Sequence, residues 1–300
     1  MNKLINKNNN LENNNLENNN LENNNLENNE FNFTNFYTVL PQHKTIKIID
    51  IDFLTWFIGF FEANGSFEKN GCVNITQKSS DVKLLYQIKT VLGMGKVFKK
   101  CSKNETMRWQ TNNTNINIAV QIALLFNGNI VTSSKLNSFK IWCEHWMKNE
   151  QFKSLIGSDF IIQTKPHPQY ISLNNGWLSG FIDGNGYWKI SLSIVKNKRN
   201  PINNIKMCVF TQNDIEWINN VLTVLKLGRR DGHKNVKWTI SKYEEMNQII
   251  KYINSYPHKT MKSVAFTKFC KLRNKILNKK HYGVGYEQMK LLSLEINKFY

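Results

Sequence analysis

Two twelve-residue segments of this 300-residue chain repeat nearly the same pattern. One begins Trp56-Phe57-Ile58-Gly59, and the other begins Trp177-Leu178-Ser179-Gly180, 121 residues later. Each continues with an apolar pair, an acid, a small residue, asparagine, glycine and an aromatic residue. The repetition predicts a tandem duplication in which each copy contains a short apolar helix. We expect these helices to end at Gly65 and Gly186 in the left-handed conformation, which glycine adopts without steric cost.

Small residues recur four positions apart in both segments, as Gly59 with Ala63 and Gly180 with Gly184. Helices with such a face can bring their backbones close together. We therefore expect the two helices to pack on each other near a pseudo-twofold axis. That packing would place Asn64 and Asn185 side by side at the helix ends.

Both segments resemble the nine-residue signature of the LAGLIDADG homing endonucleases, intron-encoded enzymes that cut long DNA sites. The resemblance covers residues 51–277 and includes the element order α-β-β-α-β-β-α-α in each half. It implies an α+β fold of two tandem αββαββα(α) repeats, with antiparallel saddle-shaped sheets around the paired signature helices. It also implies a monomer that is an internal pseudo-dimer. In that family the acid at the eighth signature position holds the catalytic metal, and those positions here are Asn64 and Asn185.

The charge of the chain favours a polyanionic partner. The formal net charge is +18, and the first thirty residues contribute −3, so the remainder carries +21. Nucleic acid is the natural partner for so basic a body. An anionic membrane surface is the alternative, but no strongly basic amphipathic helix and no run of 18 apolar residues is present. We expect no membrane association.

The cysteines and the overall composition bear on where the protein is found. Five cysteines are scattered without any C-x-x-C pair, which argues against a zinc site or a disulfide framework and fits a reducing compartment. The N-terminus has no signal peptide and no Arg-rich transit peptide. Heavy use of Asn, Lys and Ile suggests an AT-rich genome. Together with the family resemblance, this predicts a mitochondrial protein encoded in the organelle.

The chain divides into five predicted segments. Residues 1–50 are an Asn-rich tail and linker, in which Leu-Glu-Asn-Asn recurs every five residues. That period matches neither a helix nor a strand and predicts disorder; an interaction tail is the alternative. Residues 51–150 form the first repeat, 151–174 a linker, 175–280 the second repeat and 281–300 a C-terminal extension.

Local patterns place the elements inside each repeat. In the first we expect strands over 73–77, 96–100 and 106–111 and helices over 115–126 and 133–148, with Ser79-Ser80-Asp81 capping a further helix. In the second we expect strands over 188–194, 206–211 and 236–241 and helices over 243–256 and 263–277, with Asp214 as a cap. The aromatic residues of the signatures fall at helical spacing and are predicted to be core rather than base-stacking residues.

The resemblance also implies roles for residues outside the signatures. Gln77 and Gln212 match a position that organises water at the cut site, and Lys135 and Lys262 match basic residues that line it. The alternatives are exposed strand positions for the glutamines and solvated helix starts for the lysines. Further basic residues are candidates for contacting nucleic acid: Lys78, Arg108, Lys189, Lys196, Lys198, Arg199, Arg229, Arg230 and Lys237. Those in the loop 196–199 could instead be merely solvated.

The asparagines weaken any metal site. Mg²⁺ prefers anionic oxygen at near-octahedral geometry, and asparagine offers one neutral carbonyl oxygen. Glu62 and Asp183 lie two residues upstream, but residues at i and i+2 do not share a helix face, so they are weak candidate ligands. We therefore expect no cofactor, and Mg²⁺ only if endonuclease activity remains.

A second departure concerns the first hairpin of each repeat. Gly65 and Gln77 are 12 residues apart, whereas Gly186 and Gln212 are 26 apart. The difference corresponds to about seven residues per strand, or ~23 Å. In the family such hairpins read bases in the major groove, so the first repeat is predicted to have lost much of its half-site contact.

Three functions are compatible with these features. The leading hypothesis is a non-cleaving protein that binds structured RNA, as a splicing maturase or within an RNA-protein assembly such as the mitochondrial ribosome, because shape and phosphate contacts dominate binding to folded RNA. The second is an active Mg²⁺-dependent homing endonuclease that uses displaced acids. The third is a decaying reading frame without a selected function.

Overall fold

The computed structural model describes residues 30–40, 49–101, 105–195, 200–210, 215–233 and 236–298. Several predictions lie outside them: disorder in the Asn-rich repeats, the cap at Asp214, and the roles of Lys196, Lys198, Arg199 and Gln212. The chain separates into the units Met1–Asn32 and Phe33–Tyr300. The architecture below is that of the second unit.

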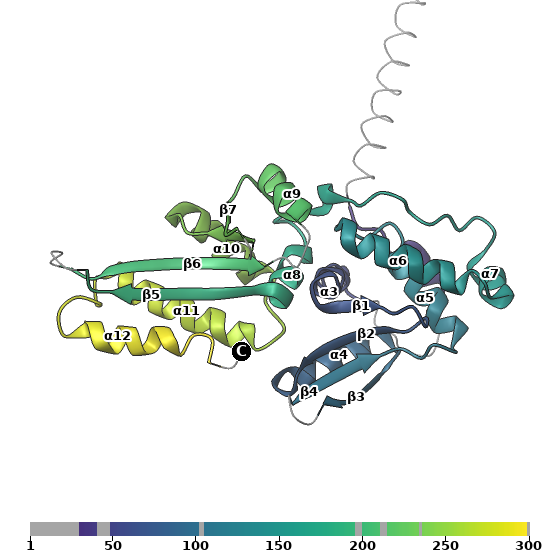
Figure 1. Ribbon diagram of the computed structural model, residues 1–300, viewed down its shortest axis with the longest axis horizontal. Helices are drawn as coiled ribbons and strands as arrows, with labels where there is room; N and C mark the ends of the chain where they lie inside the picture. The colour runs from purple at the N-terminus through teal and green to yellow at the C-terminus, as the bar shows by residue number, and fades with distance from the viewer. Residues whose placement is uncertain are drawn as a thin grey trace, which may run out of the picture. The chain divides into compact units, whose positions relative to one another are not determined.

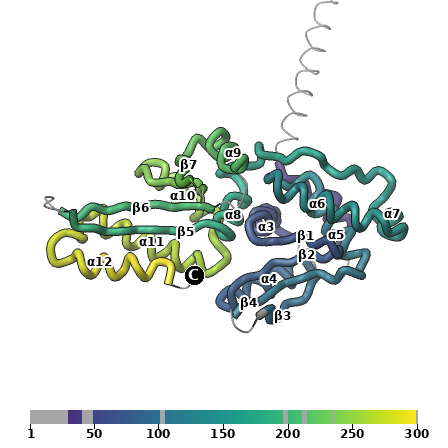
Figure 2. Tube along the Cα trace, viewed as in Figure 1, coloured from purple at the N-terminus to yellow at the C-terminus, as the bar shows by residue number. Residues whose placement is uncertain are grey.

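The first half contains one sheet and several helices (Figure 1). A short helix α2 (Thr34–Thr38) precedes the signature helix α3 (Ile51–Asn64), and the strands are β1 (Gly65–Phe67), β2 (Val73–Lys78), β3 (Lys96–Cys101) and β4 (Thr106–Gln110). The 3-10 turn η1 (Ser79–Asp81) and α4 (Val82–Leu92) connect β2 to β3, and α5 (Ile116–Phe126), α6 (Ser133–Trp146) and α7 (Glu150–Ile156) follow β4. The chain then returns from α7 to the second half through a long connection that includes η2 (Pro168–Tyr170) (Figure 2).

The second half repeats the same order. It contains the signature helix α8 (Trp177–Asn185), β5 (Gly186–Ser193), β6 (Ile202–Phe210), α9 (Ile215–Leu225), β7 (Arg229–Asp231), β8 (Lys237–Ile240), α10 (Tyr243–Ser255), α11 (Lys262–Leu277) and α12 (Gly285–Leu294). No helix in the described part of the chain combines the length and the apolar character needed to span a membrane.

The two sheets have the same topology. The strand order is β1-β2-β4-β3 in the first and β5-β6-β8-β7 in the second, and all pairs are antiparallel. Ile75 pairs with Gly65 on one side and Trp109 on the other, and Val209 pairs likewise with Gly186 and Trp238. The α+β fold of two tandem repeats is therefore confirmed.

A glycine-tryptophan pair is repeated at the same place in both sheets. Gly95 has φ 85° and Gly228 has φ 77°, a left-handed conformation that glycine adopts readily. A Cβ atom on either glycine would meet the indole nitrogen of Trp109 or Trp238. Each indole N–H donates to a backbone carbonyl just before its glycine, at 3.0 Å in the first half and 2.7 Å in the second. This turn fixes the edge of each sheet against its core.

The signature helices α3 and α8 pack in direct backbone contact (Figure 1). A Cβ on Gly59 would overlap the carbonyl oxygen of Trp177, and a Cβ on Gly180 would overlap that of Trp56. Nearer the helix ends, a Cβ on Gly184 would overlap the methyl group of Ala63. The small residues therefore permit an approach that larger side chains would block.

The prediction of left-handed caps at Gly65 and Gly186 is wrong. Their φ, ψ values are −86°, 164° and −90°, 161°, so both residues are extended and begin strands β1 and β5 directly. Glycine is required at both positions because there is no room for a Cβ atom. A Cβ would collide with the Phe61 ring at Gly65 and with Ile182 at Gly186.

The aromatic residues of the signatures lie in the core, as predicted. Trp56, Phe60 and Trp177 are at most 2% exposed, and Phe181 is 5% exposed. Burial of such side chains stabilises the fold by roughly 1.5–3 kcal/mol each. Trp188 on β5 packs against Phe266 and Phe269 of α11, so helices cover one face of the second sheet.

The prediction that Ser79-Ser80-Asp81 caps a helix is wrong in its detail. The segment is a 3-10 turn, and the Asp81 side chain makes no capping bond to α4. Its carboxylate instead accepts a hydrogen bond from the Met261 N–H of the second half, at 2.7 Å. In the other direction, Ser133 donates to Glu216 of α9 at 2.8 Å. These polar contacts join the two halves outside the signature helices.

Candidate nucleic-acid interface

The two asparagines lie together where the signature helices end. Asn64 is the last residue of α3 and Asn185 the last of α8, and both are half-buried. The Asn185 amide donates to the Ala63 carbonyl at 3.4 Å. A Cβ built on Gly184 would lie 3.2 Å from the Asn64 amide nitrogen. Each asparagine thus contacts the end of the opposite helix.

The Glu62 carboxylate organises the chain before α6. It accepts hydrogen bonds from the Val131 N–H at 3.0 Å and from the Thr132 N–H and hydroxyl at 2.8 and 2.6 Å. It also accepts from the Trp177 indole of the other half at 2.9 Å. Burial raises the pKa of Glu62, and these donated bonds oppose the rise. Glu62 is 5% exposed, and its two carboxylate oxygens accept four hydrogen bonds.

The Asp183 carboxylate organises the chain before α11 in the same way. It accepts from the Lys259 N–H at 2.6 Å, from the Thr260 N–H at 3.2 Å and from the Thr260 hydroxyl. These residues precede α11 as Val131 and Thr132 precede α6. Each acid therefore anchors the start of a later helix to a signature helix. With their oxygens engaged and buried, the acids are unsuited to replace Asn64 and Asn185 as metal ligands.

The two candidate lysines bind the carboxyl ends of the signature helices. Lys135 donates to the Gly65 carbonyl at 2.6 Å, and Lys262 donates to the Asp183 and Gly184 carbonyls at 2.5 and 2.7 Å. Cations at this end of a helix are favourable because the carbonyls carry partial negative charge. Burial lowers the pKa of Lys262 to about 8, and the carboxylates of Asp183 and Asp81 oppose that shift. Burial also lowers the pKa of Lys135.

The residues at the helix ends do not fit a Mg²⁺ site. Mg²⁺ requires hard oxygen ligands, normally with at least one carboxylate. Here the two asparagines supply neutral amides, two lysines lie close by, and the adjacent carboxylates are hydrogen-bonded to the protein. Among the described residues, no group of three or more His, Cys, Asp and Glu side chains could hold a metal ion.

Of the two candidate glutamines, Gln77 lies among the described residues and Gln212 does not. Gln77 lies near the end of β2 and is half-buried. The correspondence of Gln212 with Gln77 therefore stays a prediction.

The second sheet presents a basic face on the side away from α11. Trp188, Ile190 and Leu192 of β5 are buried, and the residues between them project to the opposite face. On that face Lys189 pairs in register with Lys206 of β6. Like charges directly opposite each other destabilise a sheet, and a bound polyanion would relieve the repulsion. Cys208 and Phe210 lie on the same face as Lys206, because side chains alternate along β6. Lys237 shares this face because it pairs with Phe210. Arg229 shares it because it pairs with Thr239, which in turn pairs with Cys208. Arg230, the next residue along β7, projects to the other face.

The first sheet has a shorter face of mixed character. β1 and β2 pair over three residues, whereas β5 and β6 pair over eight. The first hairpin is thus shorter than the second, by five register pairs rather than the predicted seven residues per strand. Arg108 is held on this face by Thr76 at 3.2 Å and Gln110 at 3.4 Å, and Lys78 is exposed.

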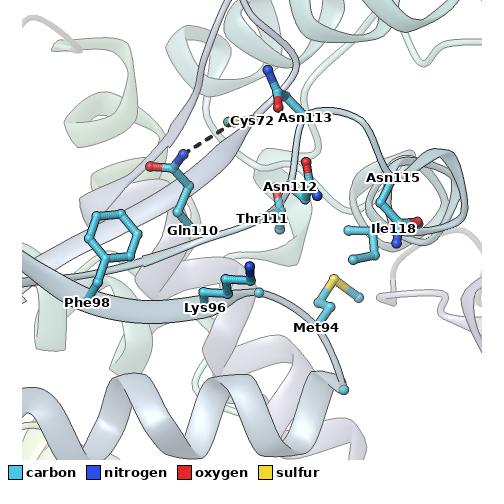
Figure 3. Close-up of a pocket in the computed structure, with 12 residues that line it drawn as sticks. Cys72, Met94, Lys96, Phe98, Gln110, Thr111, Asn112, Asn113, Asn115 and Ile118 are labelled. Carbon is cyan, nitrogen blue, oxygen red and sulfur yellow. Dashed lines mark hydrogen bonds between the residues drawn. The ribbon is translucent and has the colours of Figure 1, made fainter.

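A pocket of about 520 Å³ lies at the end of the first sheet (Figure 3). Lys96, Phe98 and Gln110 come from the strands, and Asn112, Asn113 and Asn115 come from the segment before α5. The Gln110 amide donates to the Cys72 sulfur at 3.4 Å. The pocket therefore adjoins the turn where the first hairpin is short.

Sequence reasoning missed three groups of residues near the site. Thr132 and Thr260 hold the two acids, Lys206 faces Lys189, and Tyr187 and Phe210 share the basic face. Strand alternation from Gly186 onward could have indicated Tyr187. The threonine contacts join residues some seventy positions apart in the chain and leave no local signal.

Comparisons with known proteins are consistent with this arrangement. The family model described as LAGLIDADG endonuclease matches residues 57–146 and 178–273. A curated relative from Neurospora crassa, "Probable intron-encoded endonuclease 4", is 32% identical over 241 residues. The alignment covers 76% of this chain and 41% of the relative, so the chain matches about two fifths of that protein's length.

Solved structures share the fold at low sequence identity. The meganuclease I-SmaMI bound to uncleaveable DNA is 18% identical with a TM-score of 0.66, and the match covers 82% of this chain and 99% of that one. I-AabMI bound to uncleaved DNA is 16% identical with the same TM-score and coverage. I-LtrWI bound to target DNA is 20% identical with a TM-score of 0.65, over 83% of this chain and 99% of that one.

Proposed function

Because the chain belongs to the LAGLIDADG endonuclease family, we propose that it binds nucleic acid with its two sheets and does not cut it. The observation that carries this proposal is the pair Asn64 and Asn185 at the joined ends of α3 and α8. A neutral amide in both signatures removes the two charges that would hold Mg²⁺. The nearby acids Glu62 and Asp183 are committed to anchoring helices.

The binding part of the proposal rests on the basic faces. The net charge of +18 and the paired Lys189 and Lys206 favour a phosphate backbone. The chain combines the family fold and a basic second sheet with neutral residues at both metal-ligand positions, which favours binding over cleavage. We propose a mitochondrial location, on the grounds of the composition and the intron-encoded relative.

Folded RNA is the target that we propose. The first sheet pairs only three residues in its leading hairpin, so it has little length with which to follow a DNA major groove. RNA is recognised mainly by shape, phosphate contacts and unpaired bases, which a short arm hinders less. A role as a maturase or in an RNA-protein assembly is compatible with this target.

The test is to recover nucleic acid crosslinked to the protein in its native organelle and to sequence it. The recovered sequence is then offered to the purified protein as RNA and as duplex DNA, with and without Mg²⁺. We expect tight binding of the RNA, weaker binding of the DNA and intact strands in every case. Cleavage of the DNA in Mg²⁺ by the unaltered protein would overturn the proposal.

An active endonuclease is the second candidate, because the curated relative is named as one. It would need a metal bound without carboxylates at the helix ends, or movement of Glu62 or Asp183 out of their buried contacts. On this candidate, Glu62→Gln and Asp183→Asn abolish cutting of a cognate site. On the binding-only proposal there is no cutting to abolish.

A further inference from the structure

Two aromatic rings stack on the basic face of the second sheet. Tyr187 follows Asn185 by two residues at the start of β5, and Phe210 is the last residue of β6. Their ring centroids are 5.2 Å apart and their planes differ by 22°. Tyr187 pairs in register with Cys208, two residues before Phe210, so the two rings are diagonal neighbours on one face. Diagonal aromatic pairs of this kind are within reach of each other across antiparallel strands.

The stack is not part of the core. Phe210 is 40% exposed and Tyr187 is half-buried, whereas Trp188, which projects to the opposite face, is fully buried against α11. Burial, a hydrogen bond with Cys208 and the charge of Asp231 raise the pKa of Tyr187, so its phenol stays neutral. A large ring left open on a strand face, beside charged side chains, is the kind of surface that a ligand covers.

One cation lies at the exposed ring. The Lys237 ammonium lies over the ring of Phe210, 5.8 Å from its centroid. Lys189 is two residues along the same strand face from Tyr187 and pairs with Lys206. The face therefore combines a flat apolar surface with several positive charges and one acid, Asp231, which pairs with Lys237. A nucleotide matches both features, because its base presents a π face and its phosphate carries the charge.

We infer that the Tyr187–Phe210 stack is a platform for one unpaired nucleobase of the bound strand. This inference rests on the proposed nucleic-acid binding and adds that the contacted part of the target is unpaired. A base inside a duplex is already stacked on both faces and would have to leave its helix, which costs a few kcal/mol. An unpaired base in a loop or single strand can stack at once. The platform thus favours looped RNA over duplex DNA.

The experiment compares two RNA probes that share one stem. The first is a hairpin with an unpaired loop that carries 2-aminopurine, and the second is the same stem as a fully paired duplex. Binding is measured by fluorescence anisotropy at fixed salt, and stacking by quenching of the 2-aminopurine. The variants are Phe210→Leu, which keeps an apolar side chain but removes the ring, and Phe210→Trp, which keeps a ring. Phe98→Leu is the matched control, because Phe98 is a 42% exposed phenylalanine on the other sheet.

For the loop probe we expect Phe210→Leu to weaken binding by about 5- to 150-fold and to abolish the quenching. Phe210→Trp should retain both, and Phe98→Leu should leave the quenching unchanged. Affinity for the duplex should be the same in all variants, and thermal melting checks that each one is folded.

The platform is wrong if Phe210→Leu binds and quenches the loop probe as the unaltered protein does. Nucleic-acid binding would still stand in that case. If the unaltered protein binds neither probe, the proposed function itself fails. A 5-iodouridine in the loop that crosslinks to residues outside the second sheet would also overturn the platform.

Discussion

The two halves agree where they pack and differ where they face solvent. Both have a glycine in the helix contact, a buried acid that anchors a later helix, and a tryptophan bound to the turn before an edge strand. The leading hairpin, however, pairs over three residues in the first half and eight in the second. The exposed Tyr187–Phe210 stack has Ser66 and Thr76 at the matching register positions.

This difference separates two requirements on the chain. Contacts that join the halves are constrained on both sides, because one half folds against the other. The solvent-facing sheets are constrained only by their ligand. An asymmetric ligand-facing surface on a symmetric scaffold indicates a target that engages the second half more than the first.

The largest expected effect is on the helix contact. Gly180→Ala places a methyl group on the Trp56 carbonyl and should lower the free energy of unfolding by about 3–5 kcal/mol. Gly59→Ala should cost nearly the same if the contact is symmetric. Gly93→Ala is the control, because Gly93 is left-handed but has open space around it, and it should cost only about 1–2 kcal/mol. Denaturant unfolding measures all three, and equal losses at Gly93 and Gly180 would contradict the close packing.

The anchoring acids come next. Glu62→Gln turns an acceptor into a donor against backbone N–H groups and should destabilise the protein by about 2–4 kcal/mol. Asp183→Asn should cost slightly less, because no indole among the described residues donates to Asp183 as Trp177 donates to Glu62. Glu150→Gln, at an 84% exposed side chain, should change stability by no more than about 0.5 kcal/mol. An unchanged melting temperature in Glu62→Gln would remove its assignment as an anchor.

One pH effect should come from His258 in the second half. Burial lowers the pKa of His258 to about 4, although the Asp183 carboxylate opposes the shift. The unfolded chain then binds more protons than the folded one between about pH 6.5 and 4, so stability falls as the pH drops through that window. The loss should reach about 1–3 kcal/mol. In His258→Leu this part of the pH dependence should be absent; an equally steep decline would show that other groups cause it.

The smallest effect is on nucleic-acid affinity. Lys189→Gln with Lys206→Gln should weaken binding of a structured RNA about five- to tenfold and lower the salt slope by about 2. Lys78→Gln with Arg108→Gln, at two basic residues of the first sheet, should change affinity by about twofold. Salt-dependent anisotropy titrations measure both. Equal losses would mean that the two sheets contact the target alike.

The sequence predicted the duplicated fold well because its signals are local. The signature helices and the order of the elements in each repeat follow from short patterns that occur twice. The contacts of Asp81 and Glu62 could not be foreseen, since they join segments far apart in the chain. Gly65 and Gly186 show a further limit: glycine was required, but for lack of space and not for a left-handed conformation. The sequence alone identifies Asn64 and Asn185, because they replace the acid of the signature in both copies.

The state of the metal site is tested most directly by a calorimetric Mg²⁺ titration of the unaltered protein and of the double variant Asn64→Asp, Asn185→Asp. We expect no saturable Mg²⁺ binding by the unaltered protein and clear binding once both carboxylates are present at the helix ends. Equal Mg²⁺ affinity in the two proteins would contradict the claim that these asparagines disable the metal site.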